Sequence, residues 1–502
     1  MSLHNLHRRS SPPQRSTQET EKKQNRRSQL RKQKYKSTRR GRIWDLLRHI
    51  PTFAIRALRL LAFVVCLLPA FIVFVWHYMT CDRIAVYYGG SRLYSAEEKN
   101  EHDNDKDSVS SGKTLVSTDG EKVDDSNGAS NGEKSYNRND PFFSRHYLDI
   151  YGSKTPSPEQ MNIDEAANKK PVVIFLTGGA WIIGYKMWGT LLARALAPFG
   201  IICIVPDYRN FPRVNIEGMV QDVDMSIQWV VDHVEEYGGD KDRVVLVGQS
   251  AGAHIGGVVV AMKAWDWLRK EMSARESTAD FPIPHLKSTY TPRQICGFIS
   301  TSSPDNLVTM RPVFHHHGLS ASVQNSIFGG APSDDRNCTA REEEDVFEKW
   351  SPYHLILKSQ MEYAKLLELD DGNRGDGIEL KDAFPRFCVI HGTADKTVPL
   401  SEAKEFILLL SKLQIPTEVK VYKEWSHTDP ILEAPMCGDH TYHRDIYDLV
   451  CVWTASNSFS NINGLRSNGV NRSITKFDES HTLLKPICPS VLVDAARFCN
   501  PF

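Results

Sequence analysis

A serine placed between two glycines is the first feature of this chain that could do chemistry. Residues 248–252 read Gly-Gln-Ser-Ala-Gly, after the apolar run at 243–248 and before small residues that favour a helix. A strand, this pattern and a helix together are typical of a tight turn that lifts a serine hydroxyl above the edge of a sheet. Larger residues beside the serine would collide with neighbouring elements. We therefore predict that Ser250 is a nucleophile rather than an ordinary turn residue.

A serine hydroxyl needs a general base, and the base needs an acidic group that orients it. Asp395 follows the apolar run at 387–392, and His427 follows the next strand-like run, at 418–423. If both runs are parallel strands, their carboxyl ends meet at the edge of the sheet where the serine lies. We predict that Asp395 is the acid and that His427 is the base.

Other acidic and imidazole groups are weaker candidates. Asp429 could compete with Asp395, but it lies too close to His427 in the sequence to come from a separate strand end. His254 follows the serine turn and is interpreted as a packed helix residue. The three histidines at 315–317 resemble metal ligands, but adjacent residues do not share one helix face, so a solvated loop is the preferred interpretation.

Attack of a serine on a carbonyl also needs donors for the oxygen that becomes negatively charged. Residues 177–181 read Thr-Gly-Gly-Ala-Trp and follow the apolar run at 171–176. Small residues there allow backbone N–H groups to face the developing charge, together with the N–H that follows the serine. A simple Gly-Gly turn is the alternative interpretation. The expected oxyanion donors are Gly178, Gly179, Ala180 and Ala251.

Short apolar runs alternate with helical stretches from residue 170 onward, and these elements must position the candidate side chains. Alternating strands and helices predict a mostly parallel sheet with helices on both faces. The segments 263–290 and 305–385 interrupt the alternation, and we expect them to cover the site. The expected strands are 83–88, 145–152, 171–176, 201–206, 243–248, 295–300, 387–392 and 418–423, and the expected helices lie near 187–198, near 217–236 and after 250.

An uncharged apolar segment precedes these strands. Residues 60–79 contain no Asp, Glu, Lys or Arg, and about 20 apolar residues are enough to span a bilayer as a helix. We predict a transmembrane or re-entrant segment at 57–79, with a buried core helix as the alternative. Basic residues ahead of it place the N-terminus in the cytosol. A single span would put the rest of the chain in the lumen, whereas a hairpin at Pro69 would return it to the cytosol.

The formal net charge of zero conceals an uneven distribution of charge. Residues 1–42 carry 14 Lys and Arg against two Glu, which predicts a disordered basic cytosolic head. A nucleic-acid tail is the alternative, but we expect no nucleic-acid partner. The tract 96–139 is predicted to be a disordered acidic and polar insertion. Residues 457–502 are predicted to be a C-terminal tail with a short amphipathic helix over 490–499. Ten scattered cysteines indicate neither a zinc site nor a redox pair.

Residues 171–256 and 386–450 resemble the α/β-hydrolase esterases that carry a His-Gly-Gly-x-Trp motif, and in particular the isoprenylcysteine methylesterases. Thr177 stands where many hydrolases with this motif have histidine, and the isoprenylcysteine methylesterases share this departure. The similar runs are TGGAWIIGYKMWG (177–189), PDYRNFP (206–212), YGGDKDRVVLVGQSAGAHI (237–255) and SHTDPIL (426–432).

The resemblance implies an α/β-hydrolase fold, a mostly parallel sheet flanked by helices, over residues 82–95 and 140–456. It implies a serine carboxylesterase with Ser250, Asp395 and His427 as catalytic residues, which removes the methyl ester from C-terminal prenylcysteine through an acyl-enzyme. The implied partners are a prenylated protein or prenylcysteine methyl ester and an endoplasmic reticulum or Golgi membrane, and no metal or organic cofactor is needed. A broader carboxylesterase, lipase or arylformamidase and a non-catalytic hydrolase-like receptor stay open as alternatives.

Overall fold

The computed structural model describes residues 58–89, 145–153, 169–271, 286–330, 340–369, 379–457, 477–482 and 485–500. The predicted basic head at 1–42, the predicted insertion at 96–139 and much of the tail at 457–502 lie outside these residues. The domain boundaries expected from the sequence therefore stay predictions.

The described residues form an eight-stranded sheet in the order β1-β2-β4-β3-β5-β6-β7-β8. β2 pairs antiparallel with both β1 and β4, and all other neighbours run parallel. The mostly parallel sheet is confirmed, and every expected strand is present with shifts of a few residues at its ends. The strands are β1 (Ile84–Tyr87), β2 (Tyr147–Tyr151), β3 (Lys170–Leu176), β4 (Ile202–Pro206), β5 (Gly239–Gln249), β6 (Ile295–Thr301), β7 (Arg386–Gly392) and β8 (Thr417–Tyr422).

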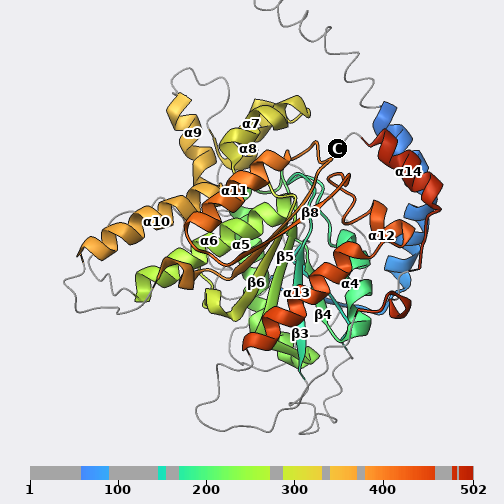
Figure 1. Ribbon diagram of the computed structural model, residues 1–502, viewed down its shortest axis with the longest axis horizontal. Coiled ribbons are helices and arrows are strands. Elements are labelled where there is room, and N and C mark those ends of the chain that lie inside the picture. The colour runs from blue at the N-terminus through green and yellow to red at the C-terminus, as the bar shows by residue number, and fades with distance from the viewer. Residues whose placement is uncertain are drawn as a thin grey trace, which may run out of the picture.

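Helices cover both faces of this sheet (Figure 1). Every second side chain of β3 belongs to an apolar cluster that includes residues of α5, α6 and α11, and the intervening side chains belong to a cluster that includes residues of α4 and α13. The central strands β3 and β4 carry continuous apolar runs because both faces of the sheet are covered in this way. The helices are α4 (Thr190–Leu196), α5 (Ile216–His233), α6 (Ala251–Glu271), α7 (Leu307–His316), α8 (Ala321–Phe328), α9 (Ala340–Lys349), α10 (Pro352–Leu369), α11 (Leu400–Lys412), α12 (Glu433–Cys437), α13 (Thr441–Asn457) and α14 (Ser490–Cys499).

The segments that interrupt the strand order differ in part from expectation. The segment 305–385 contains α7 to α10, which lie between β6 and β7 in the chain. The interruption expected to start at residue 263 is wrong in its first part, because α6 continues to Glu271. The loop expected at 315–317 is also wrong in part. His315 and His316 form the exposed end of α7, since the helical hydrogen bonds continue through them.

The apolar helix Leu58–Thr80 precedes β1 and is long and apolar enough to cross a membrane. It is continuous through Pro69, so the hairpin considered at that residue is not formed within the described chain. The helix lies beside α14, which confirms the short helix expected over 490–499 (Figure 1). One side of the apolar helix packs on α4, α12 and α14. The side chains buried on that side are Phe63, Leu67, Ala70 and Phe74.

Candidate active site

The turn between β5 and α6 holds Ser250 in a left-handed backbone conformation with φ of +52°. Its N–H donates to the carbonyl oxygen of Thr301 in the neighbouring strand, at 2.9 Å. A Cβ on Gly248 would lie 2.5 Å from Ala253 Cα, and a Cβ on Gly252 would lie 2.6 Å from the carbonyl oxygen of Thr177. Any side chain at either glycine would therefore collide with backbone. The chain folds into this turn because both flanking residues lack a side chain.

Three side chains that are distant in the sequence meet at this turn. His427 Nε2 lies 2.8 Å from Ser250 Oγ, and His427 Nδ1 lies 2.8 Å from Asp395 Oδ2. They follow β5, β7 and β8, whose carboxyl ends share one edge of the sheet. All three residues are buried, with exposed fractions of 9% or less. In the neutral tautomer that fits both partners, Nδ1 donates to the carboxylate and Nε2 accepts from the hydroxyl.

The Asp395 carboxylate is held on both of its oxygens. Oδ1 accepts the N–H groups of Thr397 and Val398, each at 2.9 Å, while Oδ2 faces His427. Burial alone would raise the pKa of Asp395, but the charge of His427, its hydrogen bond and the backbone donor outweigh burial and lower that pKa below its ordinary value. The carboxyl group is therefore ionised at neutral pH and able to orient the imidazole.

A second imidazole lies beside this carboxylate. His391 Nε2 is 2.9 Å from the carbonyl oxygen of Val398 and 3.6 Å from Asp395 Oδ2. Burial lowers the pKa of His391, so the ring is neutral and donates Nε2–H to that carbonyl. No role was predicted for His391, which lies in the apolar run at 387–392. Its position in the apolar run was the available signal that its ring is buried near the acid.

The turn at 177–181 lies directly against the serine. A Cβ on Gly178 would be 3.0 Å from Ser250 Cβ and 2.9 Å from the carbonyl oxygen of Gln249. Gly179, Ala180 and Trp181 have positive φ angles of 133°, 50° and 63°. Ala251 follows the serine in the chain. The structure thus places Gly178 and Ala251 next to Ser250, and Gly179 and Ala180 continue the same turn. The role of these four residues as oxyanion donors stays a prediction.

Aromatic side chains from three helices enclose Trp181, which ends this turn. Phe314 of α7 and Phe328 of α8 contact its ring at centroid distances of 5.4 Å and 5.1 Å. These contacts pack α7 and α8, which belong to the segment 305–385, against the turn that adjoins Ser250. The Trp181 indole donates to His254 Nδ1 at 3.3 Å, and His254 Nε2 donates to the carbonyl oxygen of Trp350 at 2.7 Å. Burial lowers the pKa of His254 to about 4, so it is a neutral, packed helix residue as predicted.

Asp429, the competing acid, is bonded to groups other than the imidazole. Its Oδ2 accepts the N–H of Ser426 at 2.7 Å, and its Oδ1 accepts from Arg497 Nε at 2.8 Å. Asp395 is therefore the carboxylate that contacts His427. Within the described ranges, no group of three or more His, Cys, Asp and Glu is placed to hold a metal ion.

No role was predicted for Gln249, the residue before the serine. Its side-chain amide is buried and donates to the backbone carbonyl of His427 at 3.3 Å. The residue next to the candidate nucleophile thereby holds the loop that carries the candidate base. The only signal in the sequence was a polar residue at the end of an apolar strand.

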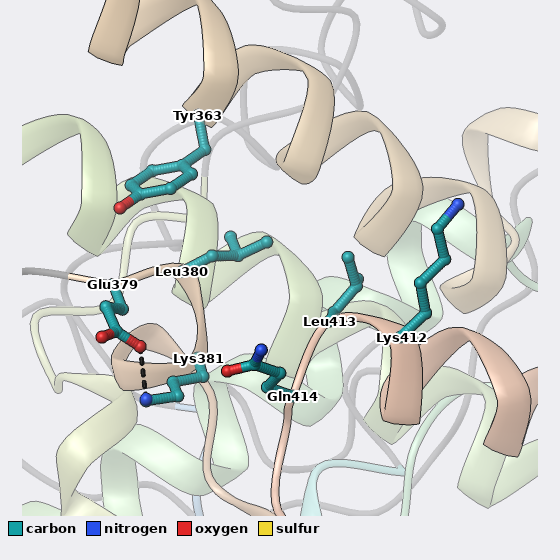
Figure 2. A pocket seen from close by; sticks show the side chains of 7 residues that line it. All are labelled: Tyr363, Glu379, Leu380, Lys381, Lys412, Leu413 and Gln414. Atoms are coloured by element: carbon teal, nitrogen blue, oxygen red, sulfur yellow. Dashed lines mark ion pairs between the residues drawn. The ribbon is translucent and has the colours of Figure 1, made fainter.

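A surface depression of about 230 Å³ lies elsewhere, and Figure 2 shows the side chains that line it. Leu380 comes just before β7, and Leu413 comes just before β8. The depression therefore lies at the amino ends of parallel strands, whereas Ser250 follows the carboxyl end of β5. It is at the opposite edge of the sheet and belongs to no part of the serine site.

Comparison with known proteins shows similarity to α/β-hydrolases. The BD-FAE model, which describes an α/β-hydrolase family, matches residues 161–362. Among solved structures, Esterase B of Lactobacillus rhamnosis has a TM-score of 0.44 at 15% identity, covering 65% of this chain and 84% of that one. The strand order, the serine turn and the family match together show an α/β-hydrolase fold.

The resemblance to isoprenylcysteine methylesterases is confirmed. The isoprenylcysteine alpha-carbonyl methylesterase ICME of Arabidopsis thaliana is 32% identical over 333 residues, covering 66% of this chain and 64% of the relative. The probable isoprenylcysteine alpha-carbonyl methylesterase ICMEL1 of Oryza sativa subsp. japonica is 34% identical over 290 residues, or 58% of each chain. Esterase LipC of Mycobacterium tuberculosis is 23% identical over 245 residues, or 49% of each. The chain therefore spans about half to two thirds of the length of these relatives.

Proposed function

We propose that this chain, an α/β-hydrolase similar to the isoprenylcysteine methylesterases, hydrolyses the methyl ester of a C-terminal prenylcysteine through an acyl-enzyme. The observation that carries the proposal is the pair of 2.8 Å hydrogen bonds that joins Ser250, His427 and Asp395. The ester chemistry is supported by the relatives, which are named as esterases. The prenylcysteine substrate is drawn from the names of the methylesterase relatives.

Formation of the acyl-enzyme uses Ser250 as the nucleophile and His427 as the base. Nε2 takes the hydroxyl proton as Oγ bonds to the ester carbonyl carbon, and the carbonyl π electrons move onto oxygen. The oxyanion lies against the N–H groups of the 177–181 turn and Ala251. When the intermediate collapses, the bond to the methoxy oxygen breaks, and His427 returns its proton to release methanol.

Hydrolysis of the acyl-enzyme repeats these steps with water. His427 Nε2 takes a proton from water as its oxygen bonds to the acyl carbon, and the bond to Ser250 Oγ then breaks. Oγ recovers the proton from His427, and the prenylcysteine leaves the enzyme with a free carboxyl group. Asp395 stays ionised throughout and stabilises the imidazolium rather than taking the proton itself.

A carboxylesterase of broader specificity is the second candidate. It is favoured by the similarity to LipC, an esterase whose name specifies no prenyl group. The non-catalytic receptor is disfavoured, because the serine, imidazole and carboxylate lie within hydrogen-bond distance of one another. In a prenylcysteine methylesterase the prenyl chain contributes to substrate binding, whereas in a general esterase the prenyl chain adds little to substrate binding.

Hydrolysis of farnesylcysteine methyl ester, of cysteine methyl ester without the farnesyl group and of p-nitrophenyl acetate by the purified full chain separates these candidates. We expect kcat/KM for farnesylcysteine methyl ester to be well above the values for the other two esters. Equal values for the two cysteine esters would contradict prenyl recognition. Ser250→Ala should lose turnover of every ester while keeping the wild-type melting temperature, and retained turnover would remove Ser250 as nucleophile.

We also propose that the helix Leu58–Thr80 attaches the enzyme to endoplasmic reticulum or Golgi membranes. Near its start, Arg59 donates to the carbonyl oxygen of Phe498 at 3.0 Å, and near its end Tyr78 donates to buried Asp149 at 3.0 Å. The hydrolase domain and α14 together thus cover one side of the helix, with polar contacts near both of its ends. An outward apolar stripe is exposed at Leu61, Val65, Leu68, Ile72, Trp76 and Met79.

This packing favours a helix that lies in the membrane surface over a free-standing single span. A spanning helix is surrounded by lipid over about 30 Å, whereas the helix Leu58–Thr80 is covered on one side by protein and makes polar contacts near both ends. Protease treatment of sealed microsomes, with epitope tags at the N-terminus and within the hydrolase domain, tests this arrangement. We expect both tags to be cleaved without detergent. Protection of one tag alone would identify a single span instead.

A further inference from the structure

The C-terminal segment 485–500 packs against two parts of the molecule that are distant in the chain. Its helix α14 contacts α12 and shares an apolar cluster with the helix Leu58–Thr80. Val493 and Ala496 are its fully buried side chains in that cluster. Figure 1 shows α14 beside the N-terminal helix, at the side of the sheet where α12 lies. The segment therefore connects the N-terminal helix with the region that follows His427.

Asn500, at the end of this segment, reaches the loop that carries the base. Its side-chain amide nitrogen lies 3.1 Å from Ser426 Oγ, 3.1 Å from Thr428 Oγ1 and 2.9 Å from Glu433 Oε1. Asn500 is only 2% exposed, so these are buried contacts. Ser426 and Thr428 are the immediate neighbours of His427. One side-chain amide thus holds the loop on both sides of the imidazole.

An ion pair fixes the same loop from the same segment. Arg497 Nε lies 2.8 Å from Asp429 Oδ1, and Asp429 Oδ2 accepts the N–H of Ser426 at 2.7 Å. Asp429 is buried, with 1% exposure. Arg497 therefore neutralises a buried carboxylate that itself holds the backbone next to His427.

The position of Asn500 is fixed in turn by the N-terminal helix. The Arg59 guanidinium lies 3.0 Å from the carbonyl oxygen of Phe498, 3.4 Å from that of Cys499 and 3.3 Å from that of Asn500. Carbonyl groups at the end of a helix lack helical partners and carry partial negative charge, so an arginine there is stabilising. Arg59 thus holds the end of α14 at the place where Asn500 enters the loop.

The loop after β8 follows an edge strand and carries His427, so contacts with other segments are needed to fix its position. Among the described strands, β8 is at the edge of the sheet and pairs only with β7. His427 must still keep two 2.8 Å hydrogen bonds at once. A misplacement of about 1 Å in a reacting group can lower a rate by about 10²-fold.

We propose that the C-terminal segment, through the side-chain amide of Asn500, positions His427 for proton transfer with Ser250. Asn500 touches neither substrate nor the reacting atoms, so it is a positioning residue. The inference rests on the proposed esterase function and deepens it. It assigns a role in turnover to a tail that carries none of the hydrolase motifs.

Two substitutions at one position test the amide donors. Asn500→Ala removes the side chain, and Asn500→Asp keeps its shape but replaces the NH2 donor with an oxygen. In both variants we expect kcat to fall about tenfold or more while KM stays within about twofold, because the imidazole is displaced but ester binding is not. We also expect the downfield proton signal of the His427 Nδ1–H bonded to Asp395 to weaken. Val491→Ser, on the exposed side of the same helix, should change neither quantity.

Several outcomes would overturn the inference. Wild-type kcat in both Asn500 variants would do so, as would a loss in Asn500→Ala that Asn500→Asp restores, since packing alone would then explain it. An equal loss in Val491→Ser would mean that any change in α14 suffices. If Asn500→Ala does not fold, the isosteric Asn500→Asp carries the test.

The wild-type chain separates this inference from the proposed function. A folded wild type that hydrolyses no ester contradicts the function. The downfield signal of His427 does not depend on turnover, so it still tests positioning. Loss of that signal in Asn500→Asp, with retention in Val491→Ser, supports the role of the tail, and retention in all variants rejects it.

Discussion

The side-chain amide of Gln249 donates a hydrogen bond to the backbone carbonyl of His427 at 3.3 Å. These residues are 178 positions apart in the chain. Gln249 directly precedes the candidate nucleophile, and His427 is the candidate base. This contact connects the serine turn with the loop that carries His427. Asn500 of the C-terminal segment contacts the same loop at Ser426 and Thr428. The base is therefore held from two directions.

Gln249→Ala should lower kcat by about three- to tenfold, because one hydrogen bond that positions His427 is lost and its buried carbonyl is left without that partner. Steady-state hydrolysis of p-nitrophenyl acetate measures the change. Gln249→Glu, which keeps the size of the side chain but loses the amide donor, is the matched variant and should be impaired as well. Unchanged kcat in both variants would show that the contact has no part in positioning.

Gly252→Ala should eliminate esterase activity, because the new Cβ would lie 2.6 Å from the carbonyl oxygen of Thr177 and meet that of Leu176 as well. Both are backbone atoms, so the serine turn or the 177–181 turn must shift. Labelling of Ser250 by a fluorophosphonate probe, together with circular dichroism, measures the effect. A folded variant that is labelled at the wild-type rate would contradict the tight fit of the two turns.

Asp395→Asn should reduce kcat by about 10³- to 10⁴-fold with little change in KM, because an amide can stabilise the wrong imidazole tautomer and cannot stabilise the imidazolium. Asp478→Asn, a change at an exposed carboxylate, serves as the control and should leave kcat unchanged. Near-normal turnover in Asp395→Asn would return Asp429 to consideration as the acid.

Asp305 should make the stability of the fold depend on pH in an unusual direction. Burial raises the pKa of Asp305 to about 8, with Glu402 adding to the effect and the Ser303 hydroxyl opposing it. An unfolded Asp has a pKa of about 3.9, so between about pH 4 and pH 8 the folded state binds a proton that the unfolded chain lacks. The free energy of unfolding therefore decreases as pH rises through this window and levels off above it.

Asp305→Asn removes this titration while keeping an oxygen that can accept from Ser303, which donates to Asp305 Oδ1 at 2.7 Å. The melting temperature of the variant should exceed that of the wild type by more at pH 8.5 than at pH 5. All other titrating groups are shared by the two proteins, so the difference isolates Asp305. A constant difference across the pH range would show that Asp305 is not protonated in the fold.

The sequence was sufficient to predict the strands, their mostly parallel pairing and the residues that meet at the carboxyl edge. Two local causes explain this success. Strands buried on both faces need continuous apolar runs, and the turn at Ser250 needs residues without side chains at 248 and 252. The end of α7 was not predictable from the three histidines, because helical hydrogen bonding and packing continued through polar residues that favour no single structure. The catalytic roles of Ser250, Asp395 and His427 remain predictions for experiment.

Only the tertiary structure decided how distant segments hold the histidine loop and where the apolar helix lies. Nothing in the local sequence of Asn500 indicates Ser426 and Thr428 as its partners, since the contact depends on α14 packing against α12 and the helix Leu58–Thr80. The composition of that helix predicted an affinity for lipid, but not that one side packs along the hydrolase domain. Local propensity and burial pattern act over a few residues, whereas these contacts depend on the shape and polar groups of surfaces that exist only after the chain has folded.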